Sequence, residues 1–428
     1  MEIMKLRMDV TPPIGAKMTY GSNQKIDTPI YIRAVVIDDQ DSRAVILSCD
    51  YTLVWGDTWL DWREAVAKAA NTSPERVFLH CVHQHDSMFL ATQLNEYLKE
   101  KDSEIISDKY CTKTINNLCF KISSLINEKS SWHKVSKLLT AEKRVKGLAA
   151  NRRMIDDQGK CFAMRWSYCG DETVRALPTG LIDPMLKTIA FAGDDGKIIA
   201  ALHFYASHPM AAYKRDMVSQ DVPGAAQEYL AANSAPETLN IYFTGCGGNV
   251  TFGKYNTGEP AERIQKLGTL LGKNMLSNLE RLEETDVGKL KFVNASFDFP
   301  LKEEINEEAI MQKISEGSSA ADNALHLVIA KNWEKWRKCE LSRMSIGDKV
   351  HFLSLPGEMC VEYQLYAQEL VPDEFLACAA YGNCTYHYIP TAKMYEEGGY
   401  EPEVGSISTK DVEIPLKKAI AEALKDLR

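Results

Sequence analysis

The segment Val77-Phe78-Leu79-His80-Cys81-Val82-His83-Gln84-His85-Asp86 joins an apolar run to two histidines that are one residue apart. Alternate side chains of an extended chain point the same way, so we expect His83 and His85 to face one cavity while the apolar residues before them are buried. Imidazole nitrogens that share a cavity are typical of a metal site. The alternative is that each ring is a hydrogen-bonded core histidine, because a neutral imidazole is easily satisfied.

Strand-like and helix-like stretches alternate on both sides of this segment. Apolar runs bounded by polar turns predict strands at residues 29–38, 43–50, 197–205, 239–243, 350–355 and 375–380. Apolar residues at three- and four-residue steps predict a helix capped by Asp57 and further helices at residues 107–127, 223–232, 261–278, 303–314, 358–370 and 409–427. The alternation predicts an α/β fold of mixed β-sheet layers covered by helices.

The length and composition of the chain favour one large domain. Of its 428 residues, 45% are hydrophobic, which is enough to build a full core. We find no internal repeat, low-complexity stretch or Gly/Ser linker that would mark a boundary. We therefore expect residues 1–428 to form a single domain, while nothing in the sequence defines an oligomeric state.

Charge and cysteine content narrow the classes of partner and compartment. The net charge is −9 and the basic residues are interspersed with acids, which argues against nucleic acid or an anionic bilayer as a partner. No segment approaches the roughly 18 consecutive apolar residues that a membrane span requires, and residues 1–13 lack an apolar stretch of signal-peptide length. Eleven cysteines without a repeated spacing are best explained as reduced thiols. We expect a cytoplasmic protein that acts on a small molecule.

Four strand-like runs end in polar or glycine-rich clusters. These clusters are His83-Gln84-His85, Ser207-His208-Pro209, Gly245-Cys246-Gly247-Gly248-Asn249 and Pro356-Gly357-Glu358. In α/β folds ligands bind at the carboxyl ends of strands, because the loops there converge over the edge of the sheet. The shared location predicts one site.

Three of these clusters contain the donor types that catalytic zinc uses. Such zinc takes nitrogen and oxygen atoms from three protein side chains and keeps a position for water. His83 and His208, with a carboxylate such as Glu358, would supply this set. Each also has a plainer interpretation: His208 could bond nearby backbone, Glu358 could be a first-turn carboxylate favoured by the helix dipole, and residues 244–249 could be only a tight turn.

A series of short motifs spans residues 9 to about 402 in a fixed order. They are Asp9-Val10-Thr11-Pro12-Pro13-Ile14-Gly15, His83-Gln84-His85, Asn151-Arg152-Arg153, His208-Pro209, Gly245-Cys246-Gly247-Gly248-Asn249-Val250, Leu355-Pro356-Gly357-Glu358, Tyr386-His387-Tyr388-Ile389-Pro390 and Glu397-Gly398-Gly399-Tyr400-Glu401. This order resembles the catalytic domain of the neutral (non-lysosomal) ceramidases. The resemblance covers nearly the whole chain.

The resemblance implies a specific set of metal ligands. In that family zinc is held by the first histidine of His-x-His, a histidine before proline, the glutamate of Pro-Gly-Glu and a tyrosine near the carboxyl end. The matching positions here are His83, His208, Glu358 and Tyr388. The implied cofactor is therefore Zn²⁺.

The resemblance also implies groups that act on the scissile amide. Arg152 and Tyr400 match an arginine and a second tyrosine that face the amide in the family. Zinc would polarise the amide carbonyl and activate water, Tyr400 and Arg152 would donate to the developing oxyanion, and His85 would carry a proton to the leaving nitrogen. The plainer alternatives are a phenol packed at a loop corner for Tyr400 and a surface ion pair for Arg152.

Two positions depart from the family pattern. The family has Gly-Asp-Val-Ser where this chain has Gly248-Asn249-Val250-Thr251, so Thr251 is the candidate to replace the serine at the reacting centre, or else it is a β-branched residue leaving a turn. The family also continues His-x-His with Ser-Gly-Pro-Gly, whereas residues 86–89 here are Asp-Ser-Met-Phe. A floor of small residues has become acidic and bulky, which alters the expected substrate pocket.

Together these features favour a zinc-dependent amidohydrolase acting on a small, polar N-acyl compound. Only about one helix follows residue 402, so we expect no immunoglobulin-like carboxyl-terminal domain, and an acidic cytoplasmic enzyme is poorly placed to meet ceramide. Three alternatives stay open: a zinc-dependent esterase, a glycoside-type hydrolase on the same scaffold, and a metal-bearing binding protein that has lost catalysis.

Overall fold

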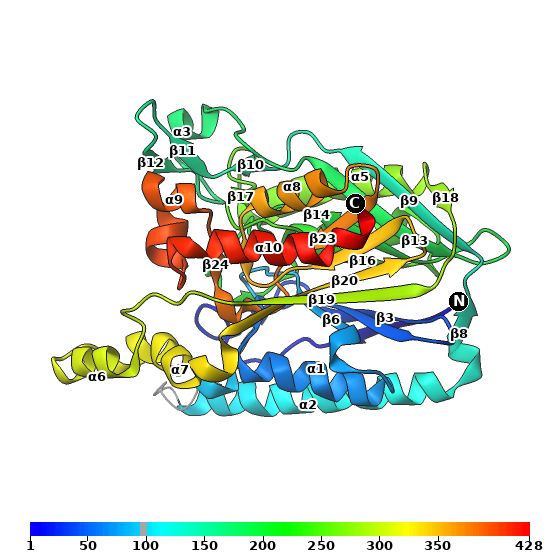
Figure 1. The fold of residues 1–428 in the computed structure, drawn as a ribbon, viewed down its shortest axis with the longest axis horizontal. Helices are drawn as coiled ribbons and strands as arrows, with labels where there is room; N and C mark the ends of the chain where they lie inside the picture. The colour runs from blue at the N-terminus through cyan, green and yellow to red at the C-terminus, as the bar shows by residue number, and fades with distance from the viewer. Residues whose placement is uncertain (95–100) are drawn as a thin grey trace.

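The computed structural model describes residues 1–94 and 101–428, and three β-sheets form its frame (Figure 1). In spatial order, the first sheet contains β6 (Val77–Cys81), β4 (Arg43–Cys49), β3 (Tyr31–Asp38), β1 (Glu2–Asp9) and β8 (Trp132–Lys134). The second contains β16 (Leu239–Thr244), β14 (Ile198–Tyr205), β13 (Met185–Ala192), β9 (Lys137–Arg144) and β18 (Glu283–Thr285). The third contains β19 (Leu290–Asp298), β20 (Lys338–Ile346), β21 (Val350–Ser354) and β23 (Phe375–Ala379).

Each of the three sheets is antiparallel except for one parallel pair at its edge. The parallel pairs are β4–β6, β14–β16 and β21–β23. Short two-stranded ladders complete the β-structure: β2 (Lys25–Ile26) with β15 (Met217–Val218), β5 (Leu53–Val54) with β7 (Phe89–Leu90), β10 (Ala150–Asn151) with β17 (Val250–Thr251), β11 (Arg153–Ile155) with β12 (Cys161–Met164), and β22 (Glu358–Met359) with β24 (Tyr388–Ile389). The sheets are therefore mixed, as the sequence predicts.

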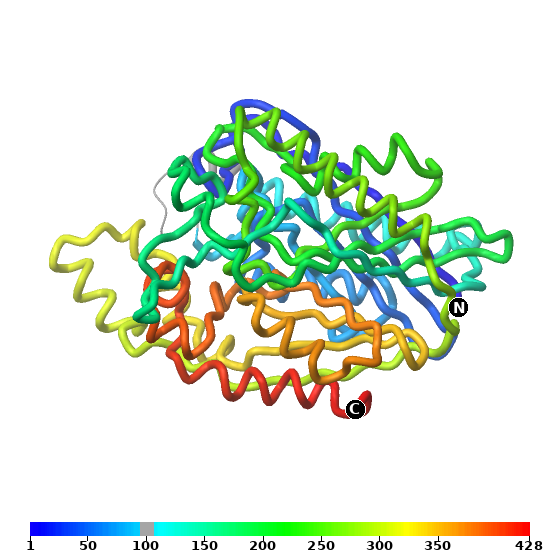
Figure 2. The backbone as a smooth tube through the Cα atoms, turned by 90° about the horizontal axis from the view of Figure 1, so that it is seen from above, coloured from blue at the N-terminus to red at the C-terminus, as the bar shows by residue number. Residues whose placement is uncertain are grey.

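Helices cover the outer faces of the sheets. The helices are α1 (Asp57–Ala69) and α2 (Lys101–Asn127) on the first sheet, α4 (Asp221–Asn233) and α5 (Pro260–Leu279) on the second, and α8 (Val361–Leu370) and α10 (Glu413–Ala423) on the third, with α3 (Glu172–Ala176), α6 (Glu307–Ser315), α7 (Ala320–Trp336) and α9 (Ala392–Glu397) at the periphery. Seen from above, the third sheet with α10 lies on one side of the molecule and the second sheet with α5 on the other (Figure 2). The predicted α/β class is confirmed.

A cluster of phenylalanines joins the three sheets. Phe78 from the first sheet contacts Phe352 from the third, with ring centres 5.3 Å apart, and Phe204 and Phe243 from the second lie 5.6 and 5.8 Å from the same ring. All four rings are buried, and burying each side chain stabilises the fold by about 2 kcal/mol. This shared core fixes the sheets relative to one another.

The carboxyl ends of the parallel strands meet above this core. The N–H of Cys81, the last residue of β6, donates to the carbonyl of Tyr381 at 3.0 Å, and the Ala380 N–H donates to the carbonyl of Thr244, the last residue of β16, also at 3.0 Å. These bonds tie together segments that are 130 to 300 positions apart in the sequence. The loops that follow the strands are thereby brought to one place, which supports the prediction of a single site.

The local sequence misplaces Glu358. It is predicted at the start of a helix, but it lies in β22 and pairs in parallel with Tyr388 of β24, and α8 begins only at Val361. The prediction is wrong because the pairing partner lies 30 positions further along the chain and leaves no local signal. Strands β1, β13, β19 and β20 and helix α7 are likewise missing from the prediction.

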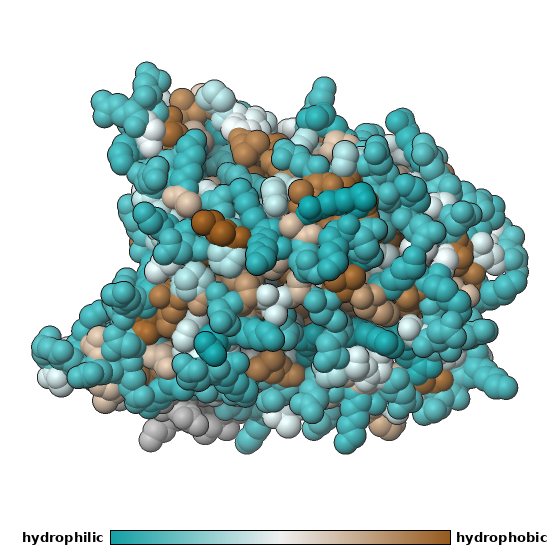
Figure 3. Space-filling model, viewed as in Figure 1, coloured by the Kyte–Doolittle hydropathy of each residue, from teal (hydrophilic) through white to brown (hydrophobic). Residues whose placement is uncertain are grey.

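The surface carries mainly polar side chains. In the part of the chain that the structure describes, no helix is long and apolar enough to cross a membrane. Figure 3 shows hydrophilic side chains over most of one face, with hydrophobic ones in small separate groups.

Candidate metal centre

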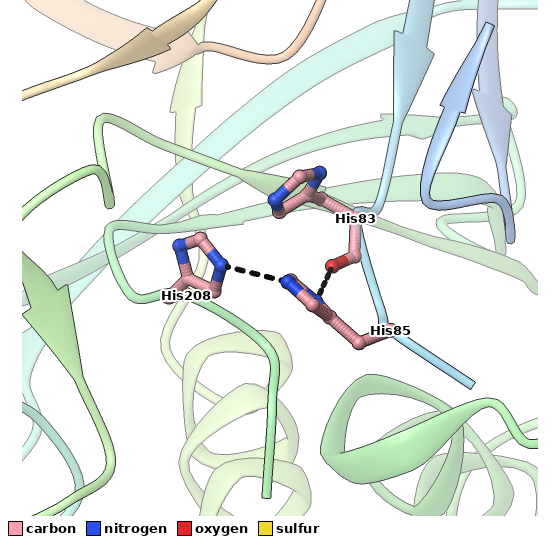
Figure 4. Close-up of side chains that lie close together, drawn as sticks. All are labelled: His83, His85 and His208. Atoms are coloured by element: carbon pink, nitrogen blue, oxygen red, sulfur yellow. Dashed lines mark hydrogen bonds between the residues drawn. The ribbon is translucent and has the colours of Figure 1, made fainter. Parts of the chain in front are cut away.

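Three buried histidines from two strand ends lie together (Figure 4). His83 and His85 follow β6, and His208 follows β14, and one ring nitrogen of each lies within 4.8 Å of those of the other two. The backbone N–H of His208 donates to the carbonyl of Val250 at 2.8 Å, which fixes the loop after β14. The structure therefore brings together the histidines that the sequence singles out.

The chain is not extended at His83, contrary to the simple alternation expected for the His-x-His segment. His83 has a φ of +76°, in the left-handed region that residues other than glycine and asparagine rarely adopt. Its N–H donates to the carbonyl of Tyr51 at 2.8 Å, and the preceding Val82 N–H donates to the carbonyl of Cys49 at 2.8 Å. Such conformations persist only where the surroundings over-determine them, and they cluster at functional sites.

Backbone carbonyls fix the tautomers of His83 and His85. The Nδ1 atom of His83 lies 2.9 Å from the carbonyl of Thr52, and the Nδ1 atom of His85 lies 3.1 Å from the carbonyl of His83. A carbonyl can only accept, so Nδ1 carries the hydrogen in both rings and Nε2 of a neutral ring keeps a free lone pair. This is the arrangement in which proteins hold metal-binding imidazoles.

The free Nε2 of His83 faces a buried carboxylate. Glu358 Oε2 lies 3.0 Å from His83 Nε2 and 3.9 Å from His208 Nδ1. Neither His83 Nε2 nor Glu358 Oε2 has a well-aligned hydrogen bond among the described residues. A ring nitrogen and a carboxylate oxygen that lie this close together in a buried position are the atom types that a divalent metal takes as ligands, so the donor set fits such an ion.

The protonation states of these groups suit metal binding. Burial raises the pKa of Glu358, but its interactions with His83 and Tyr388 outweigh this and lower it to about 2, so the carboxylate is ionised at neutral pH. Burial, together with the neighbouring His83, lowers the pKa of His85 to about 3 and that of His208 well below its usual value. Neutral imidazoles and an ionised carboxylate are the forms that bind metal.

Tyr381 is a member of the site that sequence reasoning missed. Its hydroxyl lies 3.3 Å from His208 Nδ1, and its ring stacks on His83 with centres 4.4 Å apart. The other ring nitrogen of His208, Nε2, lies 3.5 Å from His85 Nε2. Tyr381 follows the apolar run of β23, the parallel partner of β21, so its position at a strand end was the available signal.

Tyr388 reaches the centre through the β22–β24 pairing. It lies opposite Glu358 in this ladder, and its interaction with the carboxylate helps to lower the pKa of Glu358. Its ring is parallel to that of His208, with centres 6.3 Å apart. Burial and the charge of Glu358 raise the pKa of Tyr388 despite the nearby Arg152, so its phenol is protonated at neutral pH. The four predicted ligands, His83, His208, Glu358 and Tyr388, thus form one contiguous cluster.

Arg152 is buried rather than part of a surface ion pair. Its Nε donates to Glu401 at 2.7 Å, and Arg153 donates to the other oxygen of the same carboxylate at 2.7 Å. The guanidinium of Arg152 lies over the rings of Tyr388 and Tyr400, 5.1 and 5.2 Å from their centres. Its Nη2 has no partner among the described residues, so this group can still donate a hydrogen bond.

Tyr400 lies at the outer edge of the same cluster. Its ring centre is 5.5 Å from that of Tyr388, and it packs edge-on against Trp166 at 5.2 Å. Burial, with Glu358 nearby, raises the pKa of Tyr400, so its hydroxyl remains a donor. Its side chain is only partly buried.

The hydroxyl of Thr251 is engaged by the backbone. It donates to the carbonyl of Arg165 at 3.4 Å and accepts from the N–H of Gly253 at 3.1 Å. These two bonds account for it as a residue that leaves a turn, and they lend no support to a catalytic role. A reacting hydroxyl at Thr251 stays a prediction.

Asn249 connects the glycine-rich turn to helix α8. Its Oδ1 accepts from the N–H of Val361 at 2.9 Å, and its Nδ2 donates to the carboxylate of Glu362 at 3.0 and 3.2 Å. An aspartate here would place its second oxygen against Glu362, and two buried carboxylates at this distance repel. The amide at position 249 is therefore matched to its neighbour.

Comparison with solved structures shows that the chain has the neutral ceramidase fold. A structure of neutral ceramidase from Pseudomonas aeruginosa matches with a TM-score of 0.68 at 14% identity, covering 99% of this chain and 73% of that chain. A structure described as a ceramidase complexed with C2 matches with a TM-score of 0.68 at 15% identity, covering 99% of this chain and 74% of that chain. No family model matches the sequence, and no curated protein matches it.

Proposed function

We propose that this chain is a zinc-dependent amidohydrolase that cleaves the amide bond of a small N-acyl compound. The observation that carries the proposal is that two buried donor atoms, His83 Nε2 and Glu358 Oε2, lie 3.0 Å apart and neither has a well-aligned hydrogen bond among the described residues. A divalent cation can bind both atoms, and nitrogen and oxygen donors suit zinc.

His83, His208, Glu358 and Tyr388 would hold the ion, and His85 Nε2 lies close enough to take the place of one of them. Zinc supplies Lewis acidity when bound: it polarises an amide carbonyl and makes a water molecule acidic enough to attack at neutral pH. The carbonyls of Thr52 and His83 orient the rings of His83 and His85, respectively. The chain thus provides both the donors and the groups that aim them.

Three further groups of the chain would act on the substrate. The hydroxyl of Tyr400 and the free Nη2 of Arg152 would donate to the amide oxygen as negative charge develops there. His85, the most exposed of the three histidines at 9%, would pass a proton from the attacking water to the leaving nitrogen. The aromatic rings around Arg152 keep water away from its guanidinium, which strengthens its hydrogen bonds.

The fold supports amide chemistry, because solved proteins with this fold are described as ceramidases. A small polar substrate is favoured over ceramide by the residues after the His-x-His segment. Asp86 lies directly beside His85 and is buried with Arg215, at 2.6 Å. A charged pair at this position disfavours a long apolar chain there, because an alkyl group would desolvate it.

The experiment compares matched amide, ester and glycoside substrates with the zinc-loaded, the chelator-treated and the reconstituted protein. We expect turnover of the amide, its loss on chelation and its return with zinc. Faster cleavage of the matched ester or glycoside would replace the proposed reaction with one of those two. Zinc binding without turnover on any of the three would identify a binding protein, and turnover insensitive to the chelator would overturn the metal role.

The reducing cytoplasm is the compartment we propose. All eleven cysteines are free thiols, and nine of them are buried. Burial raises the pKa of several, including Cys81 and Cys378, each to about 12, which makes them unreactive. We also retain the proposal that the chain is a single domain.

A further inference from the structure

Three side chains from two distant parts of the sequence line the space beside His85. The ring of Tyr20 stacks on His85 with centres 6.1 Å apart, and Tyr213 lies 6.5 Å from His85 and 5.9 Å from Tyr20. The ammonium of Lys214 lies 5.0 and 5.6 Å from the centres of the two tyrosine rings. We call Tyr20, Tyr213 and Lys214 the tyrosine wall.

Backbone pairing holds the two halves of the tyrosine wall together. Strands β2 and β15, which follow Tyr20 and Lys214 in the sequence, pair in parallel. The N–H of Gln24 also donates to the carbonyl of Asp216 at 2.9 Å. The wall is therefore one connected structure rather than two independent loops.

A buried ion pair positions the wall against the metal centre. The carboxylate of Asp86, the residue after His85, accepts from Arg215 Nε at 2.6 Å and from the Arg215 N–H at 3.4 Å. Lys214 and Asp216 on either side have φ values of +60° and +51°, which are strained for side chains of this kind. The Asp86–Arg215 pair overcomes this strain and sets the direction in which Lys214 leaves the loop.

The unpaired polar groups of Lys214 and Arg152 are hydrogen-bond donors. Arg215 is matched by Asp86 and by Asp27, at 2.6 and 3.5 Å, whereas the ammonium of Lys214 has no carboxylate partner among the described residues. On the side of Tyr400, Arg152 presents its free Nη2. An anion is the ligand that such groups complement.

The hydroxyl of Tyr20 adds a neutral donor to this set. The ring of Tyr20 is only partly buried, so its hydroxyl can be reached by a ligand. Burial, with the nearby oxygens of Tyr400, Tyr213 and Glu358, raises the pKa of Tyr20 to about 12. Its phenol therefore remains protonated and can donate at neutral pH.

Building on the proposed amide hydrolysis, we propose that the tyrosine wall binds a carboxylate of the substrate, so that N-acyl amino acids are the preferred class over neutral N-acyl amides. In such a substrate one carbon separates the carboxylate from the scissile nitrogen. An amide held at the metal centre thus places its carboxylate beside His85, where the wall stands. The ammonium and the phenols supply charge-assisted and neutral hydrogen bonds to it.

The kinetic test uses N-octanoylglycine and its neutral analogue N-octanoylglycinamide, with release of octanoate as the readout. For the wild-type enzyme we expect kcat/KM to favour the carboxylate by about tenfold or more, mainly through KM, as one charge-assisted contact provides. Lys214→Met should remove this preference by lowering kcat/KM for the carboxylate to that for the neutral substrate in the same variant. Equal values for the two substrates in the wild type, or a preference that survives in Lys214→Met, would overturn the inference.

Lys197→Met is the matched control. Lys197 is exposed and directly precedes β14, and His208 follows the opposite end of this strand. The length of an extended strand of eight residues separates Lys197 from the metal centre by about 25 Å. The substitution Lys197→Met removes the same charge, and the variant should keep the substrate preference of the wild type. A loss of preference in Lys197→Met equal to that in Lys214→Met would assign the effect to net charge and overturn the inference.

Binding separates this inference from the proposed function. Calorimetry on chelator-treated protein compares N-benzoylglycine with N-benzoylglycinamide, so neither metal nor turnover contributes. Tighter binding of the carboxylate by the wild type but not by Lys214→Met supports the tyrosine wall even if neither amide is hydrolysed. Equal affinities, or no binding of either compound, would overturn the wall while leaving amide hydrolysis intact.

Discussion

Two sets of buried histidines in this molecule differ in what their ring nitrogens contact. His80 accepts from the Thr244 N–H at 3.1 Å and has the Ser48 hydroxyl at 3.3 Å from its Nδ1. His203 has the Thr188 hydroxyl at 3.0 Å from Nδ1 and the Asn240 amide oxygen at 3.1 Å from Nε2. Both rings therefore have a polar partner at each nitrogen, and they serve the core.

In the second set, His83 and His85 use Nδ1 on backbone carbonyls and turn Nε2 inward. The Nε2 atom of His83 lies 3.0 Å from Glu358 Oε2, and the Nε2 atom of His85 lies 3.5 Å from His208 Nε2. Residue type and burial are the same in the two sets. The distinction is that His83 Nε2 has no well-aligned hydrogen bond and that His85 Nε2 lies against another ring nitrogen, so we propose metal binding for one set and not for the other.

The largest expected effect comes from removing a member of each set in turn. His83→Ala should abolish zinc binding and reduce amide hydrolysis to background, because the ring is both a ligand and the neighbour of Glu358. His203→Ala should lower stability but keep zinc. Metal content after dialysis and calorimetric titration measure both, and undiminished zinc affinity in His83→Ala would erase the contrast between the sets.

Tyr400→Phe tests whether the Tyr400 hydroxyl, at the outer edge of the cluster that contains the second set, donates to the reacting oxygen. Loss of one oxyanion donor should lower kcat by about 10²- to 10³-fold with zinc affinity unchanged. Tyr395→Phe is the control, since its hydroxyl bonds the Ser408 carbonyl at 2.6 Å within the fold. Steady-state kinetics on both variants decide the point, and equal losses of kcat would assign the Tyr400 effect to packing.

The sequence predicts some elements of the fold better than others. The periodicity of the hydrophobic residues and the polar turns are enough to predict β3, β4 and α1, because the apolar patterns of these elements are local. Strand β1, at residues 2–9, alternates charged with apolar residues and carries no turn signal before it, so its place inside the first sheet depends on partners that local pattern does not reveal.

The candidate site divides in the same way. The positions of His83 and His208 at strand ends predict that they lie together. Tyr388, Arg152 and Tyr400 are predicted only by the resemblance of the ordered motifs to a known family. Tyr381 and the Asp86–Arg215 pair depend on contacts between segments more than 100 positions apart, which no local pattern encodes. Long-range packing therefore decides which polar residues complete the site.

His203, a member of the first set, should make the free energy of unfolding depend on pH. Burial lowers the pKa of His203 to about 4 from 6.5, so the unfolded chain binds its proton more readily than the folded protein does. Its contribution to the free energy of unfolding is therefore fully present above pH 6.5 and is lost as pH falls towards 4, by about 2 kcal/mol at pH 5. Urea unfolding of metal-free wild type and His203→Gln between pH 7.5 and 5 should show the steeper loss in the wild type. Parallel curves would contradict a neutral, core-bound His203.

The smallest effect tests whether a neighbour of the second set tunes it. Tyr381→Phe keeps the ring stacked on His83 but removes the hydroxyl 3.3 Å from His208 Nδ1. Partners of this kind fix ring orientation, and their loss weakens metal affinity by about tenfold or somewhat more. Tyr363→Phe removes an equally buried hydroxyl that bonds the Pro390 carbonyl at 2.9 Å, away from the histidines.

Both tyrosine variants should lose about 1 kcal/mol of stability with their hydrogen bond, so stability alone does not separate them. Zinc affinity does, because only the Tyr381 hydroxyl contacts a ring of the second set. Competition with a chromogenic chelator measures it, and saturating zinc should restore the hydrolysis rate of Tyr381→Phe, since affinity rather than chemistry is altered. Equal zinc affinities in the two variants would confine the metal-tuning groups to the carbonyls of Thr52 and His83, and would place Tyr381 with the residues that serve only the core.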